Sequence, residues 1–195
     1  MKASAVVAVL IAFFAGSATA VKVGLARKQA VDMVVIHSTG GPACDAVTGK
    51  PVWVGAGTLR TNVATIEAHP RLGIHYMIDR DGTLYASVPE GQVAHHVFKY
   101  SQRSIAIELV NEGDGRDPFP EPQLGALVTL LRDITRRRGI GPVGIKRHSD
   151  LDHSMLSCAK AQRRKVDPGA AFPFQVVLDR VFQSNGAPNT TRRAS

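Results

Sequence analysis

Two segments far apart in the chain hold residue types that together could bind a catalytic metal ion. The first contains His37, and the second contains His148 and Asp167. Two imidazoles and one carboxylate are sufficient protein ligands for a catalytic Zn²⁺, which keeps a fourth position for water. Lys165 lies two residues before Asp167. The set predicts a hydrolase rather than a basic globular domain without a site.

Two apolar runs predict the strands that would position these groups. Val31–His37 is rich in β-branched residues and indicates a buried strand with His37 at its carboxyl end. Ser104–Val110 indicates a second strand, in which Glu108 alternates with apolar residues. Carboxylates are rarely buried without a partner, so a carboxylate at this position requires an explanation.

The rest of the chain alternates between strand and helix signals. His75–Val88 predicts a hairpin, because Asp81-Gly82 separates two alternating segments. The predicted helices are Thr61–Ala68, capped by Thr61 or Asn62, then Glu121–Arg138 and Phe174–Phe182, with a short strand over Val143–Lys146. Strands mixed with helices predict a single α/β (α+β) domain.

The N-terminal 20 residues are typical of a secretory signal peptide. Lys2 precedes an apolar run that is short for a membrane span, and Ala18-Thr19-Ala20 is a small-residue cleavage site. We therefore expect a signal peptide over 1–20, a catalytic domain over 21–185 and a polar C-terminal tail over 186–195. An uncleaved anchor is the alternative. Cleavage predicts a periplasmic or extracellular protein without a stable membrane anchor.

The formal charge of +8 favours an anionic partner. Export makes nucleic acid the least expected one and leaves anionic lipid or wall polymer. The basic residues cluster in Arg136–Arg138 and Arg163–Lys165. Such runs are more often a solvated face than a specific site, and the sequence does not fix an oligomeric state.

The two cysteines each follow a candidate histidine ligand: Cys44 follows the segment that contains His37, and Cys158 follows the segment that contains His148. An even number of cysteines in an exported chain is compatible with a disulfide, and only one intramolecular pairing exists. Such a bond would join the two loops that must converge at the metal. Two free thiols are the alternative.

Six segments in sequence resemble the zinc-dependent N-acetylmuramoyl-L-alanine amidases of the amidase-2 type, which are related to peptidoglycan recognition proteins. These segments are Val35–Thr39, His75–Thr83, Val93–His96, Ser104–Asn111, Arg147–Asp150 and Lys165–Gly169. The resemblance implies a central mixed β-sheet flanked by helices, with zinc in a surface cleft. It also implies hydrolysis of the amide between N-acetylmuramic acid and the L-alanine of the stem peptide, in peptidoglycan or muropeptides.

The resemblance assigns a role to each candidate residue. His37, His148 and Asp167 match the family's zinc ligands, with His153 as a nearby competitor of His148. Glu108 matches the carboxylate that moves the proton, and Lys165 matches the lysine that stabilises the oxyanion. The alternatives are a structural salt bridge for Glu108 and a solvated cationic run for Lys165.

One segment departs from the family pattern. His96 matches a histidine that often follows a tryptophan, but His95 precedes it here. We assign His96 to the substrate cleft and expect a weaker aromatic surface there. The alternative function is a non-catalytic peptidoglycan-binding module, since recognition proteins of this fold can lose metal ligands and keep the groove.

Overall fold

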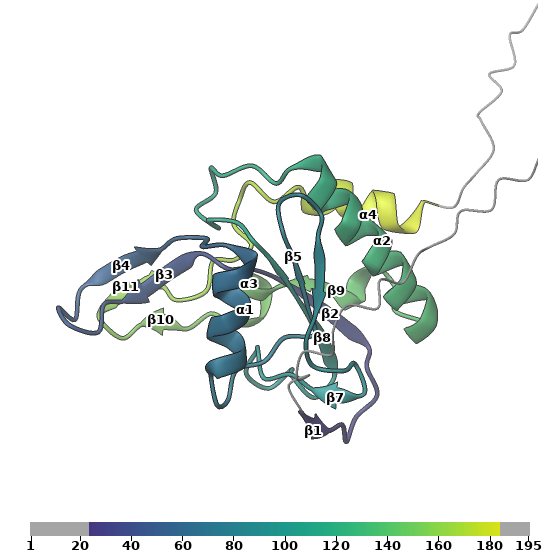
Figure 1. Cartoon of the computed structure of the whole chain (residues 1–195), viewed down its shortest axis with the longest axis horizontal. Helices are drawn as coiled ribbons and strands as arrows, with labels where there is room; N and C mark the ends of the chain where they lie inside the picture. The colour runs from purple at the N-terminus through teal and green to yellow at the C-terminus, as the bar shows by residue number, and fades with distance from the viewer. Residues whose placement is uncertain (1–23, 184–195) are drawn as a thin grey trace, which may run out of the picture.

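A five-stranded mixed sheet lies at the centre of the computed structural model, which describes residues 24–183 (Figure 1). Its strand order is β6-β5-β8-β2-β9, formed by Leu84–Ala86, Tyr76–Ile78, Ser104–Leu109, Met33–Ser38 and Ile145–Arg147. Strand β2 runs parallel to β8 and β9, and β5 runs parallel to β8, whereas β6 is antiparallel to β5. The carboxyl ends of β2, β8 and β9 therefore meet at one edge.

Helices cover both faces of this sheet, and Figure 1 shows α1 on one side and α2 with α4 on the other. On one face, α2 (Glu121–Arg138) and α4 (Phe174–Phe182) bury Leu131 and Val177 against Ile107 of β8. On the other face, α1 (Leu59–Ala68) packs against Ala106 of the same strand. Residues of opposite parity on β8 thus enter opposite cores, as its alternation predicts. The predicted α/β (α+β) domain is confirmed.

Helix α2 has the bounds that the sequence predicts. The residues at its helical spacing are buried: Leu124, Leu127, Leu131 and Ile134. Pro120 is the N-cap, and Gly139 ends the helix with φ 66°, a left-handed conformation that favours glycine. The last turn carries three arginines, which interact favourably with the negative end of the helix dipole. Helix α4 also begins and ends where predicted.

Several predicted boundaries differ from the structure, and strand β2 for example covers Met33–Ser38 rather than Val31–His37. Helix α1 begins at Leu59 rather than Thr61, because the N-cap is Thr58, which forms a capping box with Thr61. The segment predicted as a strand over Val143–Lys146 is a 3₁₀ turn over Pro142–Gly144, followed by β9. Pro142 fixes φ and lacks an N–H, which suits the first position of such a turn better than a strand.

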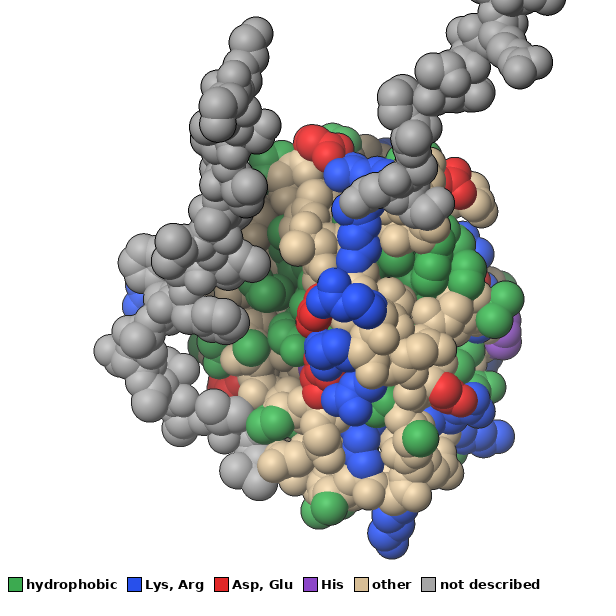
Figure 2. Space-filling model, turned by 90° about the vertical axis from the view of Figure 1, so that its right-hand side faces the viewer, with side chains coloured by type: hydrophobic (Ala, Val, Ile, Leu, Met, Phe, Trp, Pro, Cys, Tyr) green, Lys and Arg blue, Asp and Glu red, His purple; other side chains and the backbone are tan. Residues whose placement is uncertain are grey.

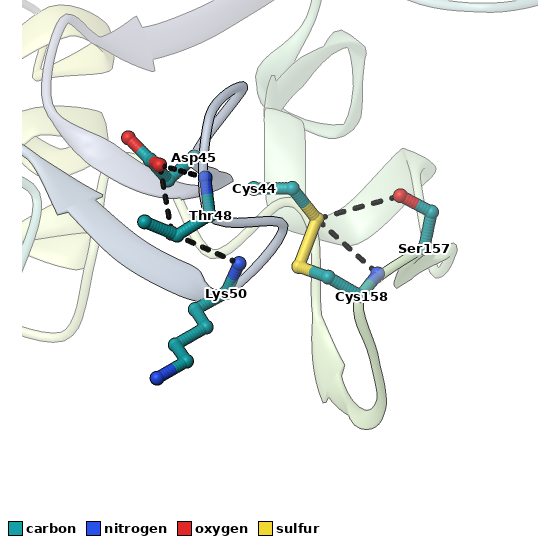
Figure 3. The surroundings of a disulfide bond; sticks show 6 residues. All are labelled: Cys44, Asp45, Thr48, Lys50, Ser157 and Cys158. Atoms are coloured by element: carbon teal, nitrogen blue, oxygen red, sulfur yellow. Dashed lines mark hydrogen bonds between the residues drawn. A yellow bond between two sulfur atoms is a disulfide. The ribbon is translucent and has the colours of Figure 1, made fainter.

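Two small hairpins extend together from one side of the central sheet (Figure 1). One pairs β3 (Gly41–Cys44) with β4 (Pro51–Val54), and the other pairs β10 (Met155–Leu156) with β11 (Ala159–Arg163). A third pair, β1 (Leu25–Ala26) with β7 (Gln92–Val93), lies elsewhere. A disulfide between Cys44 and Cys158 joins the first two hairpins across 114 residues of sequence (Figure 3). The structure thus contains the disulfide rather than two free thiols.

Basic side chains gather on the side of the molecule where α2 and α4 lie (Figure 2). Many of them are paired: Arg137 and Arg138 each place an Nη2 2.8 Å from a carboxylate oxygen of Glu90. Burial opposes ionisation of Glu90, but hydrogen bonds from both arginines and from Tyr76 outweigh it and lower its pKa to about 2. The Arg136–Arg138 run is therefore a solvated face whose arginines form ion pairs.

The ends of the chain lie outside the described residues. The predicted signal peptide over 1–20 and the predicted tail over 186–195 both fall there and stay predictions. Between residues 24 and 183, none of the helices combines the length and the apolar character that a membrane span requires.

Candidate metal centre and active-site cleft

Three side chains from distant parts of the sequence converge in the structure. The Nδ1 atoms of His37 and His148 lie 2.9 Å apart, and Oδ2 of Asp167 lies 3.2 Å from the first and 3.0 Å from the second. All three residues are buried. The structure therefore brings together the three residues that the sequence predicts as metal ligands.

The parallel sheet explains how these residues meet. His37 lies near the carboxyl end of β2, directly beside Glu108 of β8 in the strand register. His148 begins the short helix α3 (His148–Leu151) immediately after β9. The carbonyl of Asp167 accepts a hydrogen bond from the Ser149 N–H at 3.0 Å, which attaches the third candidate ligand to α3.

A glycine keeps the loop after Asp167 close to the loop after β8. Gly169 has φ +91°, and a Cβ atom there would lie 2.6 Å from the carbonyl oxygen of Gly113. Glycine alone fits such a close approach without strain. Gly169 therefore allows the two loops to pack closely beside the candidate ligand Asp167.

The donor set fits zinc. Ligand atoms about 2.0–2.1 Å from a tetrahedral Zn²⁺ lie roughly 3.3 Å from one another, close to the spacing of the three atoms here. Imidazole nitrogen and carboxylate oxygen are both common zinc ligands. His153, the competitor considered for His148, is exposed and is not part of this cluster. Cys158 is in the disulfide and has no free thiolate to offer.

The electrostatics favour the unprotonated forms of His37 and Asp167. Burial lowers the pKa of His37 to about 4, with a further contribution from the neighbouring His148. Burial opposes ionisation of Asp167, but its contacts with His148 and His37 outweigh that effect and hold its pKa well below the usual range. Neutral imidazole and ionised carboxylate are the forms that bind a metal.

Glu108 is the partly buried carboxylate that the sequence left unexplained. Its Oε2 atom is buried and accepts no hydrogen bond from the described residues. Burial, and then the negative charge of Asp167, raise the pKa of Glu108 to about 8, although Lys165 opposes the shift. Within residues 24–183, Glu108 therefore has no salt bridge that would make it a structural residue.

A cleft of about 220 Å³ opens above the cluster. Lys165 lines it together with Glu108, and Lys165 makes no hydrogen bond or ion pair with the residues that the structure describes. The opposite wall is neutral and comes from α1 and the segment after it, including Asn62, Thr65 and Ile74. The cleft thus has a polar floor with one cation and a wall without charged side chains.

His96 also lines the cleft, but both of its ring nitrogens have partners inside the protein. Its Nδ1 lies 2.9 Å from Nε2 of His37, and its Nε2 lies 2.9 Å from Oγ of Ser104. Substrate binding by His96 stays a prediction, with only the ring surface available for it. Sequence analysis missed Ser104, because a serine at the start of a strand carries no signal of contact with a distant histidine.

Comparisons with known proteins agree with this geometry. The family model described as N-acetylmuramoyl-L-alanine amidase matches residues 27–170. The amidase AmiD of Escherichia coli is 32% identical over 107 residues, which are 47% of this chain and 36% of that protein. The chain therefore matches well under half the length of this curated relative.

Solved structures show the same fold. A complex of E. coli AmiD with anhydro-N-acetylmuramic acid-L-Ala-D-gamma-Glu-L-Lys aligns with a TM-score of 0.59 and 25% identity, over 77% of this chain and 57% of that one. The AmpDh3 structure from Pseudomonas aeruginosa aligns with a TM-score of 0.57 and 21% identity, over 89% and 66% of the two chains. With three quarters of its sequence matched and the fold shared, this chain belongs to the N-acetylmuramoyl-L-alanine amidase family of the amidase-2 type.

Proposed function

We propose that this protein is a zinc-dependent peptidoglycan amidase that hydrolyses the amide between N-acetylmuramic acid and L-alanine of the stem peptide. The observation that carries the proposal is the meeting of His37, His148 and Asp167 at the floor of a cleft that Glu108 and Lys165 also line. A binding module needs the cleft but has no use for an unpaired buried carboxylate beside three metal ligands.

Different residues of the cleft would bind the metal and transfer the proton. His37, His148 and Asp167 would hold the metal. When bound, zinc supplies a Lewis acid that polarises a carbonyl and makes water a stronger nucleophile at neutral pH. Glu108 then takes a proton from the attacking water and delivers it to the leaving amine, which needs a carboxylate that changes protonation near neutral pH. The positive charge of a metal held by the three ligands would lower the raised pKa of Glu108 toward that range.

Lys165 is placed to stabilise negative charge. Its ammonium group faces the cleft without a competing partner among the described residues, so it can interact with the carbonyl oxygen as that atom becomes negative. This role explains why Lys165 has no ion-pair partner among the described residues, whereas the adjacent Arg164 pairs with Asp152.

The substrate class follows from family and from one relative. The E. coli AmiD structure holds a muropeptide with an anhydro sugar. We extend this ligand class, a muramic acid joined to a peptide, to the present chain. Export to the periplasm or beyond is part of the proposal, supported by the sequence of residues 1–20 and by the disulfide, since disulfides persist in oxidising compartments.

The test is a cleavage assay with the purified protein and muropeptides, analysed by mass spectrometry. We expect stem peptides that begin with L-alanine, lost on chelation and restored by Zn²⁺. His37→Ala should abolish both zinc binding and cleavage. His153→Ala, which removes an exposed histidine outside the cluster, is the matched control and should retain both.

Other products identify other functions. Muropeptide binding without cleavage in the zinc-loaded protein would favour the recognition module. Cleavage within the stem peptide would keep the metal site but change the substrate bond. Binding that weakens steeply with salt and ignores chelators would indicate charge-driven attachment to an anionic polymer.

A further inference from the structure

A continuous chain of hydrogen bonds leads from the candidate metal centre to the backbone. Nε2 of His37 lies 2.9 Å from Nδ1 of His96, and Nε2 of His96 lies 2.9 Å from Oγ of Ser104. The Ser104 hydroxyl in turn donates to the carbonyl of Tyr100 at 2.8 Å. Each link has normal hydrogen-bond length.

The last link fixes the direction of every other link. A carbonyl only accepts, so the single proton of the Ser104 hydroxyl points to Tyr100. The hydroxyl oxygen can therefore only accept from His96, which places the proton of that ring on Nε2. The Nδ1 atom of His96 is then an acceptor, and His37 must donate to it from Nε2. The remaining nitrogen of His37, Nδ1, is left as a lone pair that points at His148 and Asp167.

We propose that His96 and Ser104 are positioning residues that hold His37 in its metal-binding tautomer and orientation. The Tyr100 carbonyl then sets the tautomer of His37 through three hydrogen bonds in series. This inference rests on the proposed metal centre. It differs from a role for His96 in substrate binding, because the polar atoms of His96 are already engaged. Partners of this kind commonly change metal affinity by about 10- to 100-fold.

The outer end of the relay is rigidly held. The guanidinium of Arg27 donates to the carbonyls of Ser101, Gln102 and Ser104 at 3.1, 2.7 and 2.8 Å. The Ser101 hydroxyl accepts from the backbone N–H of His96 at 3.2 Å. The segment around Tyr100 is thereby held in place, and the backbone of His96 is fixed beside it.

His148, the second candidate histidine ligand, has no such relay among the residues that the structure describes. Nε2 of His148 lies 3.9 Å from Oδ2 of Asp152, which is beyond hydrogen-bond length. Its backbone position at the start of α3 therefore contributes more to its orientation than a side-chain partner does. The contrast predicts that the two ligands respond differently to changes in their surroundings.

Zinc affinity of the purified protein, measured by competition with a fluorescent chelator, tests the relay. His96→Phe keeps the ring but has no acceptor, and should raise the zinc Kd by about 10- to 100-fold. His96→Asn places a carbonyl oxygen near the former Nδ1 position, and should recover most of that loss. Ser104→Ala should raise the Kd by roughly 3- to 10-fold, because the His96 donor loses its acceptor.

Two serine variants serve as controls. Ser87→Ala removes a buried hydroxyl that donates to Glu67 and is not part of the relay, and Ser101→Ala removes the hydroxyl that holds the His96 backbone. The first should leave the zinc Kd within about twofold of wild type. A loss in Ser101→Ala as large as in Ser104→Ala would assign the effect to loop stability and overturn the relay.

Nitrogen NMR of the metal-free protein gives a readout that does not depend on zinc. The signals of His37, identified by their loss in His37→Ala, should show a proton on Nε2 in wild type and a mixture of tautomers in His96→Phe. A proton on Nδ1 of His37 in wild type would refute the relay, as would unchanged zinc affinity in His96→Phe. If wild type binds no zinc at all, the proposed function fails, while the tautomer result still decides the relay.

Discussion

Removal of the disulfide should lower the free energy of unfolding by an amount that the structure allows us to estimate. Cys44 and Cys158 close a loop of 114 residues. The chain-entropy relation for a loop of this length gives about 5 kcal/mol, and measured values for disulfides are commonly about 2–4 kcal/mol. Small proteins have total stabilities of about 5–15 kcal/mol, so the bond supplies a large fraction.

The perturbation is the double variant Cys44→Ala/Cys158→Ala, with stability measured by urea denaturation in the presence of a metal chelator. The chelator is needed because a metal that binds only the folded protein would add its own stabilisation. We expect a loss of about 2–5 kcal/mol relative to oxidised wild type. Reduction of wild type with a phosphine should give a similar loss, and the same reagent should not change the double variant.

A loss below about 1 kcal/mol would refute the reasoning, because the entropy of a long closed loop would then contribute almost nothing. An equal effect of the phosphine on the double variant would show that the reagent acts on something other than the disulfide. Such a small loss of stability would mean that other contacts hold β3 and β10 together without the disulfide.

Three further outcomes follow from the described contacts. Glu108→Gln should lower kcat by about 10²- to 10⁴-fold while the zinc Kd changes little, as calorimetry and initial rates would show; equal losses in both would make Glu108 a ligand. Lowering the pH from 4.5 toward 2 should remove up to about 3 kcal/mol of stability that Glu90 contributes at neutral pH, because its folded pKa is depressed to about 2. Glu90→Gln should flatten that part of the pH–stability curve, and an unchanged curve would contradict the ion-pair account. Leu131→Ala should cost about 2–5 kcal/mol in urea denaturation, whereas the exposed Val143→Ala should stay within about 0.5 kcal/mol.

The regular elements of the core were predictable because their sequence patterns have strong physical causes. Helix α2 combines buried leucines at helical spacing with a proline before it and a left-handed glycine after it, so pattern and boundary signals agree. Strand β8 alternates between two cores, and this alternation is visible in the sequence. The same logic placed His37 at a strand end and Glu108 beside apolar neighbours.

The elements at the margin were not predictable in the same way. All four residues of β4 are exposed, so β4 shows no alternation between a buried and a solvent face. The β3–β4 and β10–β11 hairpins depend on pairing and on the disulfide, which act between residues distant in sequence. The contacts of the Ser104 hydroxyl with His96 and with the Tyr100 carbonyl were also not predictable. They depend on the path of the chain between residues 96 and 104 rather than on any one residue type.

The fold explains how three electron-donating atoms can stay this close together. Unprotonated nitrogen and oxygen atoms at 2.9–3.2 Å repel one another, so each must be held from outside the cluster. Strand β2 and the relay hold His37, helix α3 holds His148, and the Ser149 N–H holds the Asp167 backbone. One proton can join only two of these atoms, whereas a tetrahedral dication contacts all three at once. Because a strand end and the start of α3 hold the two histidines, and a backbone hydrogen bond ties Asp167 to α3, the arrangement would favour a metal over a proton before any substrate binds.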